Sequence, residues 1–187
     1  MKKIKFWILI SCYLILAIAD GALTYINTPD LSLEGNPLVA NLGLGWTTLA
    51  VANVAVFILI FSASYYSYFK YKTAFNNETK FTAYCSQIVY DRADMFWKGL
   101  IPKHITPYIA GLGFSLLYSA IIARLIVVAE WLCITFNLTW SDPYFYFKDV
   151  YFFGRVDVFV AVIVAVIGMF YWFYVEFKKQ LDFVKTK

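Results

Sequence analysis

Residues 105–131 read ITPYIAGLGFSLLYSAIIARLIVVAEW, and this stretch decides the fold. It is apolar throughout except for Arg124, Glu130 and a few small hydroxyl residues. The hydrocarbon core of a bilayer is about 30 Å thick and is crossed by roughly 20 apolar helical residues. Within lipid, only helices and closed barrels satisfy all their backbone groups, and a stretch of this length is helical. Residues 105–131 therefore predict a transmembrane helix.

Three further stretches have the same character. Each is long enough to cross a bilayer as a helix, and each is interrupted by only one or two strongly polar residues. They lie at residues 6–26, 46–68 and 150–174. The sequence thus predicts an all-α integral membrane protein, with four transmembrane helices in a single domain over residues 1–187.

Composition supports this class. Of the 187 residues 61% are hydrophobic and only 15% are charged, whereas soluble domains carry about 25% charged residues. These values exclude a disordered chain, a coiled coil and an ordinary soluble enzyme.

The basic residues predict the orientation. All of them except Arg124, Lys148 and Arg155 lie at the two termini or between the second and third spans. Lys and Arg concentrate on the cytoplasmic side of membrane proteins. We therefore expect a cell-membrane protein with both termini in the cytoplasm. The N-terminus also has a competing interpretation as a cleaved signal peptide ending near Ala17-Ile18-Ala19, although apolar residues continue past Asp20.

Two short helices are expected outside the spans. In the first outer loop, Asn36 is a good N-cap and Pro37 suits a first helical position, which predicts an interfacial helix from Pro37 to about Leu42. Between the second and third spans, apolar residues at helical spacing predict an amphipathic helix that ends at Gly99 and Pro102. This second helix lies either on the inner membrane surface or against the ends of the spans. We expect residues 139–149 to form the second outer loop.

Small residues recur every fourth position in the third span. A stripe of this kind lets another helix approach closely. It serves either packing within one chain or contact with a second copy or partner membrane subunit. The stripe consists of Gly111, Ser115, Ser119 and Ala123.

A polar group lies at nearly the same depth in every span. Asp20, Asn53, Arg124 and Asp157 each fall about six or seven residues from the outer end of their span. At 1.5 Å per residue this places them roughly 9–11 Å below the outer boundary. Polar residues are costly in a membrane and mark functional sites by default. The remaining candidates of this layer are Thr24, Glu34, Asn36, Glu130 and Arg155.

The layer has a structural and a functional interpretation. Arg124 is expected to pair with Asp20 or Asp157, and Arg155 with Glu130 or Glu34, as ion pairs that fix helix register. The candidate acids outnumber the candidate bases. We therefore expect the unpaired acids to be protonated, to bind a cation or to be in contact with solvent. A ligand-binding or catalytic site is therefore the alternative to a purely structural network.

The sequence offers no cofactor or metal site. The cysteines Cys12, Cys85 and Cys133 are scattered, and His104 is the single histidine, so neither a disulfide framework nor a zinc site is expected. There is no glycine-rich phosphate loop, and no nucleophile has a basic partner at its depth. Membrane lipid is the expected partner, and nucleic acid is not.

One pattern is familiar. Asp20-Gly-Ala-Leu-Thr24, followed by Glu34-Gly-Asn36-Pro37, resembles small prokaryotic membrane proteins grouped as a domain of unknown function. These proteins carry an Asp-x-x-x-Thr helix followed by Glu-x-Asn-Pro, and the resemblance covers about residues 13–66. It implies that the five named residues act together, and it implies no reaction.

These observations favour a non-enzymatic membrane protein, either an assembly subunit or a module that binds a small ligand or ion. An oligomeric cation-coupled transporter or channel is one alternative. A lipid- or peptide-active intramembrane enzyme that uses Asp20 and Asp157 as a pair of carboxylates is the other.

Overall fold

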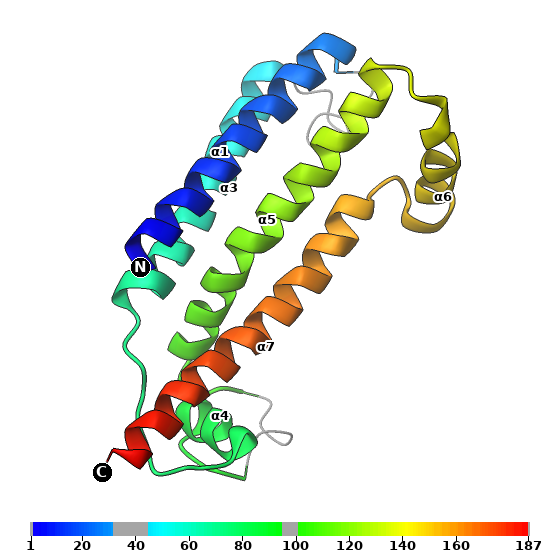
Figure 1. Cartoon of the computed structure of the whole chain (residues 1–187). Helices are drawn as coiled ribbons and strands as arrows, with labels where there is room; N and C mark the ends of the chain where they lie inside the picture. The colour runs from blue at the N-terminus through cyan, green and yellow to red at the C-terminus, as the bar shows by residue number, and fades with distance from the viewer. Residues whose placement is uncertain (1, 32–44, 95–100, 187) are drawn as a thin grey trace. The chain divides into compact units, whose positions relative to one another are not determined.

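The computed structural model describes residues 2–31, 45–94 and 101–186, and the regular structure in these ranges is entirely helical (Figure 1). The predicted all-α class is confirmed. The predicted helix from Pro37 to Leu42 lies outside the described residues. In chain order the helices are α1 (Lys2–Asn27), α3 (Trp46–Tyr65), the π-helical turn η1 (Tyr66–Lys70), α4 (Phe81–Tyr90), α5 (Thr106–Thr135), the 3-10 turn η2 (Thr139–Ser141), α6 (Asp142–Phe152) and α7 (Val156–Lys185).

In the part of the chain that the structure describes, four helical segments are long and apolar enough to cross a membrane, as predicted. Both α5 and α7 contain 30 residues and so measure roughly 45 Å. This length exceeds the hydrocarbon thickness, so each helix has turns to spare at one end or both. The four segments are Lys3–Asn27, Trp46–Lys70, Thr106–Thr135 and Val156–Lys185.

The fourth span begins at Val156 and not at residue 150 as predicted. Residues 150–152 belong to α6, which occupies most of the expected outer loop. Phe153 and Gly154 then adopt positive φ angles of 51° and 73°, a left-handed conformation that ends a helix. An average of hydropathy along the chain does not register such a turn, because Phe153 is itself apolar.

The amphipathic helix α4 is shorter than predicted. It ends at Tyr90 because Asp91 is left-handed (φ 58°), and its predicted stop signals, Gly99 and Pro102, come later in the chain. Residues 95–100 lie outside the described ranges. The buried face of α4 packs with Trp172 and Phe177 of α7 in one hydrophobic cluster. This packing matches the interpretation in which the helix lies against the end of a span.

The chain forms two compact units, and each is described by itself. Unit 1 comprises Met1–Phe61 and Leu117–Val164, and unit 2 comprises Ser62–Leu116 and Ala165–Lys187.

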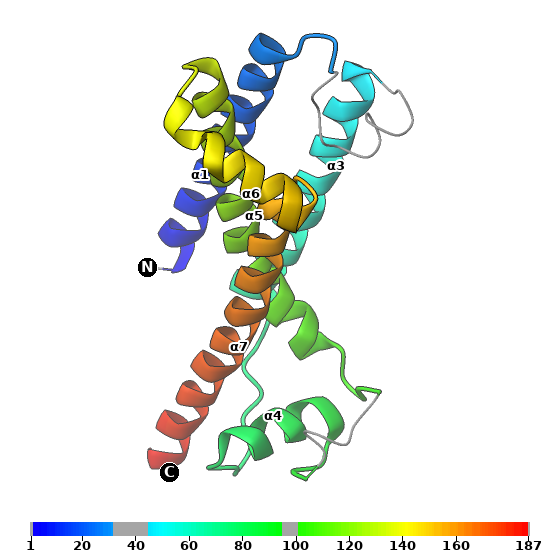
Figure 2. The ribbon, with the colours of Figure 1, turned by 90° about the vertical axis from the view of Figure 1, so that its right-hand side faces the viewer.

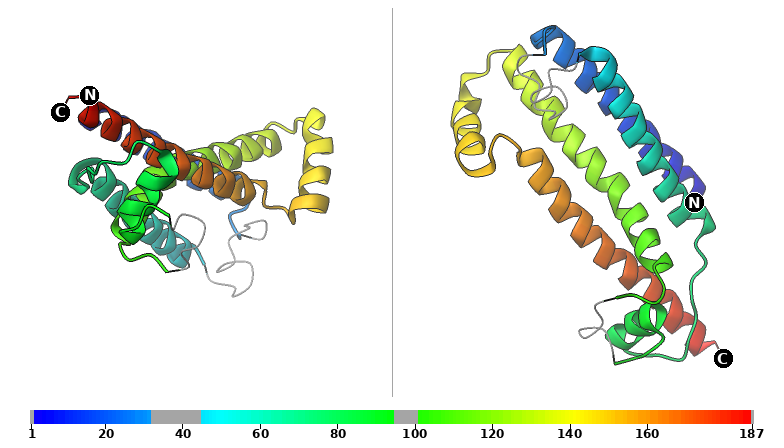
Figure 3. Two further views of the ribbon diagram at one scale, coloured as in Figure 1. Left: turned by 90° about the horizontal axis from the view of Figure 1, so that it is seen from below. Right: turned by 180° about the vertical axis from the view of Figure 1, so that it is seen from behind.

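In unit 1, α1 and α3 run side by side (Figures 1 and 3). Aromatic pairs join them along the contact. The rings of Tyr13 and Phe57 stack with centroids 5.9 Å apart, and Tyr25 meets Trp46 edge to face at 5.5 Å. Such pairs add about 0.5–1.5 kcal/mol beyond the area they bury.

Also in unit 1, α5 and α7 meet at a hydrogen bond of 2.6 Å from the Ser119 hydroxyl to the Ala161 carbonyl oxygen. The two helices run in opposite directions along this contact. Because Ser119 lies level with Ala161, Val156 lies level with about Arg124. From that level α5 continues for about 11 residues, or roughly 16 Å. The chain returns from Thr135 to Val156 through α6 (Figure 2).

In unit 2, small residues bring backbones close together. A methyl group added at Gly113 would lie 2.1 Å from the Ala63 carbonyl oxygen, and one at Gly168 would lie 2.8 Å from the Ser115 side chain. A methyl group added at Gly111 would lie 3.1 Å from the Trp172 side chain. The predicted stripe thus meets α7 of its own chain at Gly111 and Ser115 here, and at Ser119 in unit 1.

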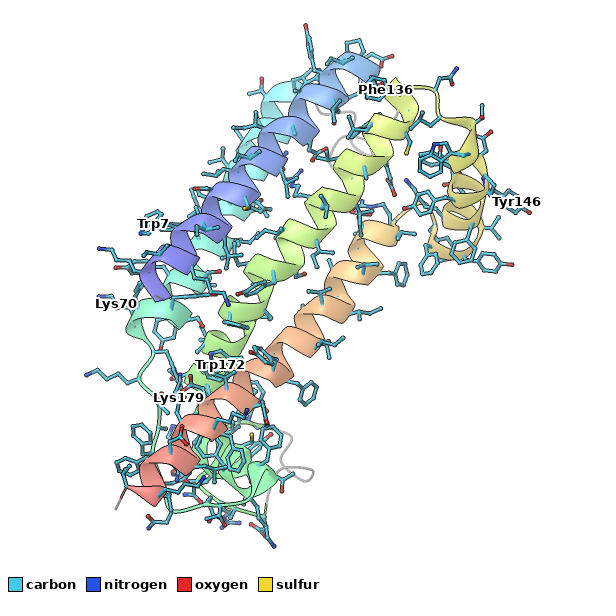
Figure 4. The ribbon with its side chains drawn as sticks, in the orientation of Figure 1. Trp7, Lys70, Phe136, Tyr146, Trp172 and Lys179 are labelled. Atoms are coloured by element: carbon cyan, nitrogen blue, oxygen red, sulfur yellow. The ribbon has the colours of Figure 1, made fainter. Side chains whose placement is uncertain are left out.

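Large apolar side chains are exposed on the long helices, beyond the end of α5 and on α6. Trp7 of α1 is 48% exposed, Phe136 beyond α5 is 66% exposed and Tyr146 of α6 is 72% exposed (Figure 4). An apolar surface of this extent needs a lipid or protein environment.

Candidate functional site

Arg124 is the centre of the polar layer in unit 1. Its guanidinium donates hydrogen bonds to the Asp20 carboxylate of α1 and to the Asn53 side-chain oxygen of α3. The Asn53 amide nitrogen donates to the Leu49 carbonyl oxygen at 3.0 Å, which turns the amide oxygen toward Arg124. One side chain of α5 therefore joins three helices.

Asp20 is buried, with 8% of the residue exposed. Its carboxylate has the Arg124 guanidinium on one side, and the buried indole of Trp131 lies beside it. Thr24, one turn further along α1, is also buried at 2% exposure. A carboxylate in such surroundings is stabilised only by its cationic partner and its hydrogen-bond donors.

Glu130 forms the second ion pair. The Lys148 ammonium lies 2.7 Å from one carboxylate oxygen, and the Tyr144 hydroxyl donates to the other at 2.5 Å. Burial and the adjacent Glu130 carboxylate raise the pKa of the Tyr144 hydroxyl, so it stays a donor at neutral pH. This contact fastens α6 to α5.

Sequence reasoning missed both partners of Glu130. Tyr144 and Lys148 are four residues apart on α6 and therefore share one face of the helix. The available signal was the position of Lys148, one of the few basic residues outside the inner clusters. Residues 139–149 were expected to form a loop, and a loop does not place residues four apart on one face. The shared direction of Tyr144 and Lys148 was therefore not predicted.

Arg155 and Asp157 form the third ion pair, at the beginning of α7. The guanidinium donates two hydrogen bonds of 3.1 Å, one to each carboxylate oxygen. Asp157 lies in the first turn of α7, where the helix dipole favours a negative charge. By the Ser119–Ala161 register, Asp157 lies level with about Ala123, so this pair belongs to the same layer as Arg124.

Within the described residues, each acid of the layer has its own base. Glu34 and Asn36 lie outside the described ranges, so their part in the layer stays a prediction. Once Lys148 is included, the excess of acid expected from the sequence is absent from the described part. The three pairs are Asp20–Arg124, Glu130–Lys148 and Asp157–Arg155.

This arrangement sets what the layer can do chemically. Two carboxylates act as an acid–base pair when they compete for one proton. Here Asp20 and Asp157 each have a separate guanidinium instead. The described residues also contain no group of three or more metal-ligating side chains. The layer is best suited to fixing the register of α1, α3 and α5 and to fastening α6 to α5.

The chain matches no family model, no curated protein and no solved structure. The resemblance to small prokaryotic membrane proteins therefore stays a prediction.

Proposed function

We propose that this chain is a non-catalytic multi-pass protein of the cell membrane, an assembly subunit or binding module whose polar layer is a structural lock. The observation that carries the proposal is the one-to-one pairing of Asp20, Glu130 and Asp157 with Arg124, Lys148 and Arg155. A proton- or cation-coupled site needs a carboxylate that exchanges partners, and these carboxylates already have fixed ones.

Cation titrations test this role. The purified protein in detergent is titrated with NaCl, KCl and N-methylglucamine chloride at equal ionic strength, and its melting temperature and tryptophan fluorescence are followed. Trp131 lies beside Asp20 and reports on the layer. A structural lock predicts the same response to all three salts. A saturable response to one cation that disappears in Asp20→Asn would instead support the transporter or channel alternative.

The orientation is part of the proposal. The basic residues support cytoplasmic termini, which would place residues 71–104 inside and residues 136–155 outside. The test is thiol labelling of a cysteine at Asn77 or at Trp140, both exposed, after Cys12, Cys85 and Cys133 are replaced by serine. An impermeant reagent added to intact cells should label Trp140→Cys alone. Labelling of both positions from one side would overturn the orientation.

A further inference from the structure

In unit 2, an extended segment is fastened to α7 by side chains. The Thr73 hydroxyl donates to the Glu176 carboxylate at 2.6 Å. The Asn76 N–H donates to the Gln180 side-chain oxygen at 3.0 Å, and the Gln180 amide donates to the Asn76 carbonyl oxygen. Glu176 and Gln180 are 3% and 0% exposed. These contacts hold residues 71–76 in one conformation without a helix or a sheet.

A second set of contacts joins the end of α4 to the residues before α5. Asp91 accepts a hydrogen bond from the Lys103 ammonium, and its other oxygen lies 3.2 Å from the His104 imidazole. The backbone N–H groups of Lys103 and His104 both donate to the Val89 carbonyl oxygen, at 3.0 and 2.9 Å. The Asp91 carboxylate is therefore already paired with the Lys103 ammonium.

Between these two fixed parts lies an open groove of about 370 Å³. Lys72 and His104 lie on its rim as exposed side chains. Tyr71, Asn76 and Gln87 supply further hydrogen-bonding groups to its walls. Because the Lys103 ammonium pairs with Asp91, the Lys72 ammonium gives the groove a net positive charge.

Two residues of the groove wall also carry buried polar atoms that have no hydrogen-bond partner. Among the described residues, the buried side-chain polar atoms without a hydrogen-bond partner are the Ser67, Tyr71 and Tyr84 hydroxyls and the Asn76 amide nitrogen. All belong to unit 2, and Tyr71 and Asn76 line the groove. A buried polar group without a partner costs about 1–3 kcal/mol. The Asn76 nitrogen can only donate, so the partner it lacks is an acceptor.

The groove adjoins two spans at their ends. Tyr71 and Lys72 directly follow the span that ends at Lys70, and His104 closely precedes the span that begins at Thr106. In a membrane, these residues lie at the level of lipid headgroups. We propose that the groove binds the phosphate group of a phospholipid or of a soluble phosphate ester, with Lys72, His104 and Asn76 as its ligands. This proposal does not depend on the role of the polar layer.

Calorimetric titration of the full-length protein in detergent tests the site. The probes are short-chain phosphatidylglycerol, glycerol phosphate and a phosphate-free short-chain diacylglycerol. Lys72→Gln removes the cation, and Asn76→Asp replaces the donor with a negatively charged oxygen but keeps the oxygen that accepts the Glu78 N–H. Each should weaken phosphate binding by about tenfold or more. Lys80→Gln, which changes an exposed lysine that does not line the groove, should change affinity less than twofold.

The three probes separate the sources of phosphate. Binding of phosphatidylglycerol alone identifies a lipid headgroup, and equal binding of glycerol phosphate identifies a soluble ester. The site is overturned if the diacylglycerol binds as well as the phospholipid, if no probe binds, or if Lys80→Gln weakens binding as much as Lys72→Gln. Should Asn76→Asp fail to fold, Lys72→Gln decides alone, because Lys72 is exposed.

Discussion

The two units differ in how completely their buried polar groups are paired. In unit 1, Asp20, Glu130 and Asp157 are each paired with a base from the same unit. In unit 2, hydroxyl and amide groups such as those of Tyr84 and Asn76 are buried without a partner. Native proteins leave few buried polar groups unpaired, and each exception needs an explanation. The comparison teaches that the described part of unit 1 pairs its buried charges internally, whereas that of unit 2 leaves four buried polar atoms without a partner.

The largest effect is expected when the polar layer loses its central base. Arg124→Leu leaves the Asp20 carboxylate buried without a cation, which should cost about 3–5 kcal/mol of stability. The measurement is the melting temperature in detergent. The double variant Asp20→Asn/Arg124→Gln removes both charges and should recover much of the loss. Equal stability of Arg124→Leu and the wild type would show that unit 1 does not depend on its pairing.

Glycine substitutions should produce the next largest difference. Gly113→Ala places a methyl group 2.1 Å from the Ala63 carbonyl oxygen, so α3 and α5 must separate in unit 2. Overpacking of this kind costs about 1–3 kcal/mol. Gly21→Ala in α1 of unit 1 is the matched control, because nothing lies within 4 Å of the added methyl group. It should leave thermal stability unchanged or slightly higher; similar losses for both variants would contradict the close packing at Gly113.

One substitution made in both units tests the comparison directly. Tyr144→Phe removes the hydroxyl that donates to Glu130 at 2.5 Å and should lower stability by about 1 kcal/mol. Tyr84→Phe removes a buried hydroxyl without a partner, so it should be neutral or stabilising. Thermal unfolding of the two variants under the same conditions measures both effects. A destabilising Tyr84→Phe would mean that this hydroxyl has an acceptor in solution.

The smallest effect concerns pH. Hydrogen bonding from Lys103 and His104 lowers the pKa of Asp91 below its ordinary 3.8. Its contribution to stability is therefore fully present above that value, and it is lost as the pH falls through the lower pKa of the folded state. Hydrogen exchange at the Lys103 and His104 amides, corrected for intrinsic rates, should show protection falling to the Asp91→Asn level only in strong acid. A loss of protection between pH 5 and 7 would contradict this assignment.

The spans could be predicted from sequence, because long apolar stretches have one stable backbone in lipid. Equal depth, which depends only on the helical rise, predicted that Arg124 pairs with Asp20 or Asp157, and the structure shows the pair with Asp20. The partners of Glu130 could not be found this way. They depend on α6, and an 11-residue segment with charges on it has the composition of a loop.

The groove could not be predicted either. It is lined by residues from an extended segment, from α4 and from the start of α5, and no spacing in the sequence brings Lys72 close to His104. The stop of α4 at Asp91 was missed for a related reason. A non-glycine residue in the left-handed conformation gives a weaker signal than the later Gly99 and Pro102.

The offset between the long helices bears on bilayer thickness. In unit 1, α5 extends about 11 residues past the level of Val156, and α6 is fastened to these extra turns through Glu130. In unit 2, the last turns of α7 are covered by α4 and residues 71–76. The end of α5 in unit 1 and the end of α7 in unit 2 are thus each covered by other parts of the chain, so their side chains are not covered by lipid alone. In a thinner or thicker membrane, we therefore expect the change in bilayer thickness to alter how much of these covered ends lies in lipid. The helices that carry Asp20 and Arg124 should keep their tilt.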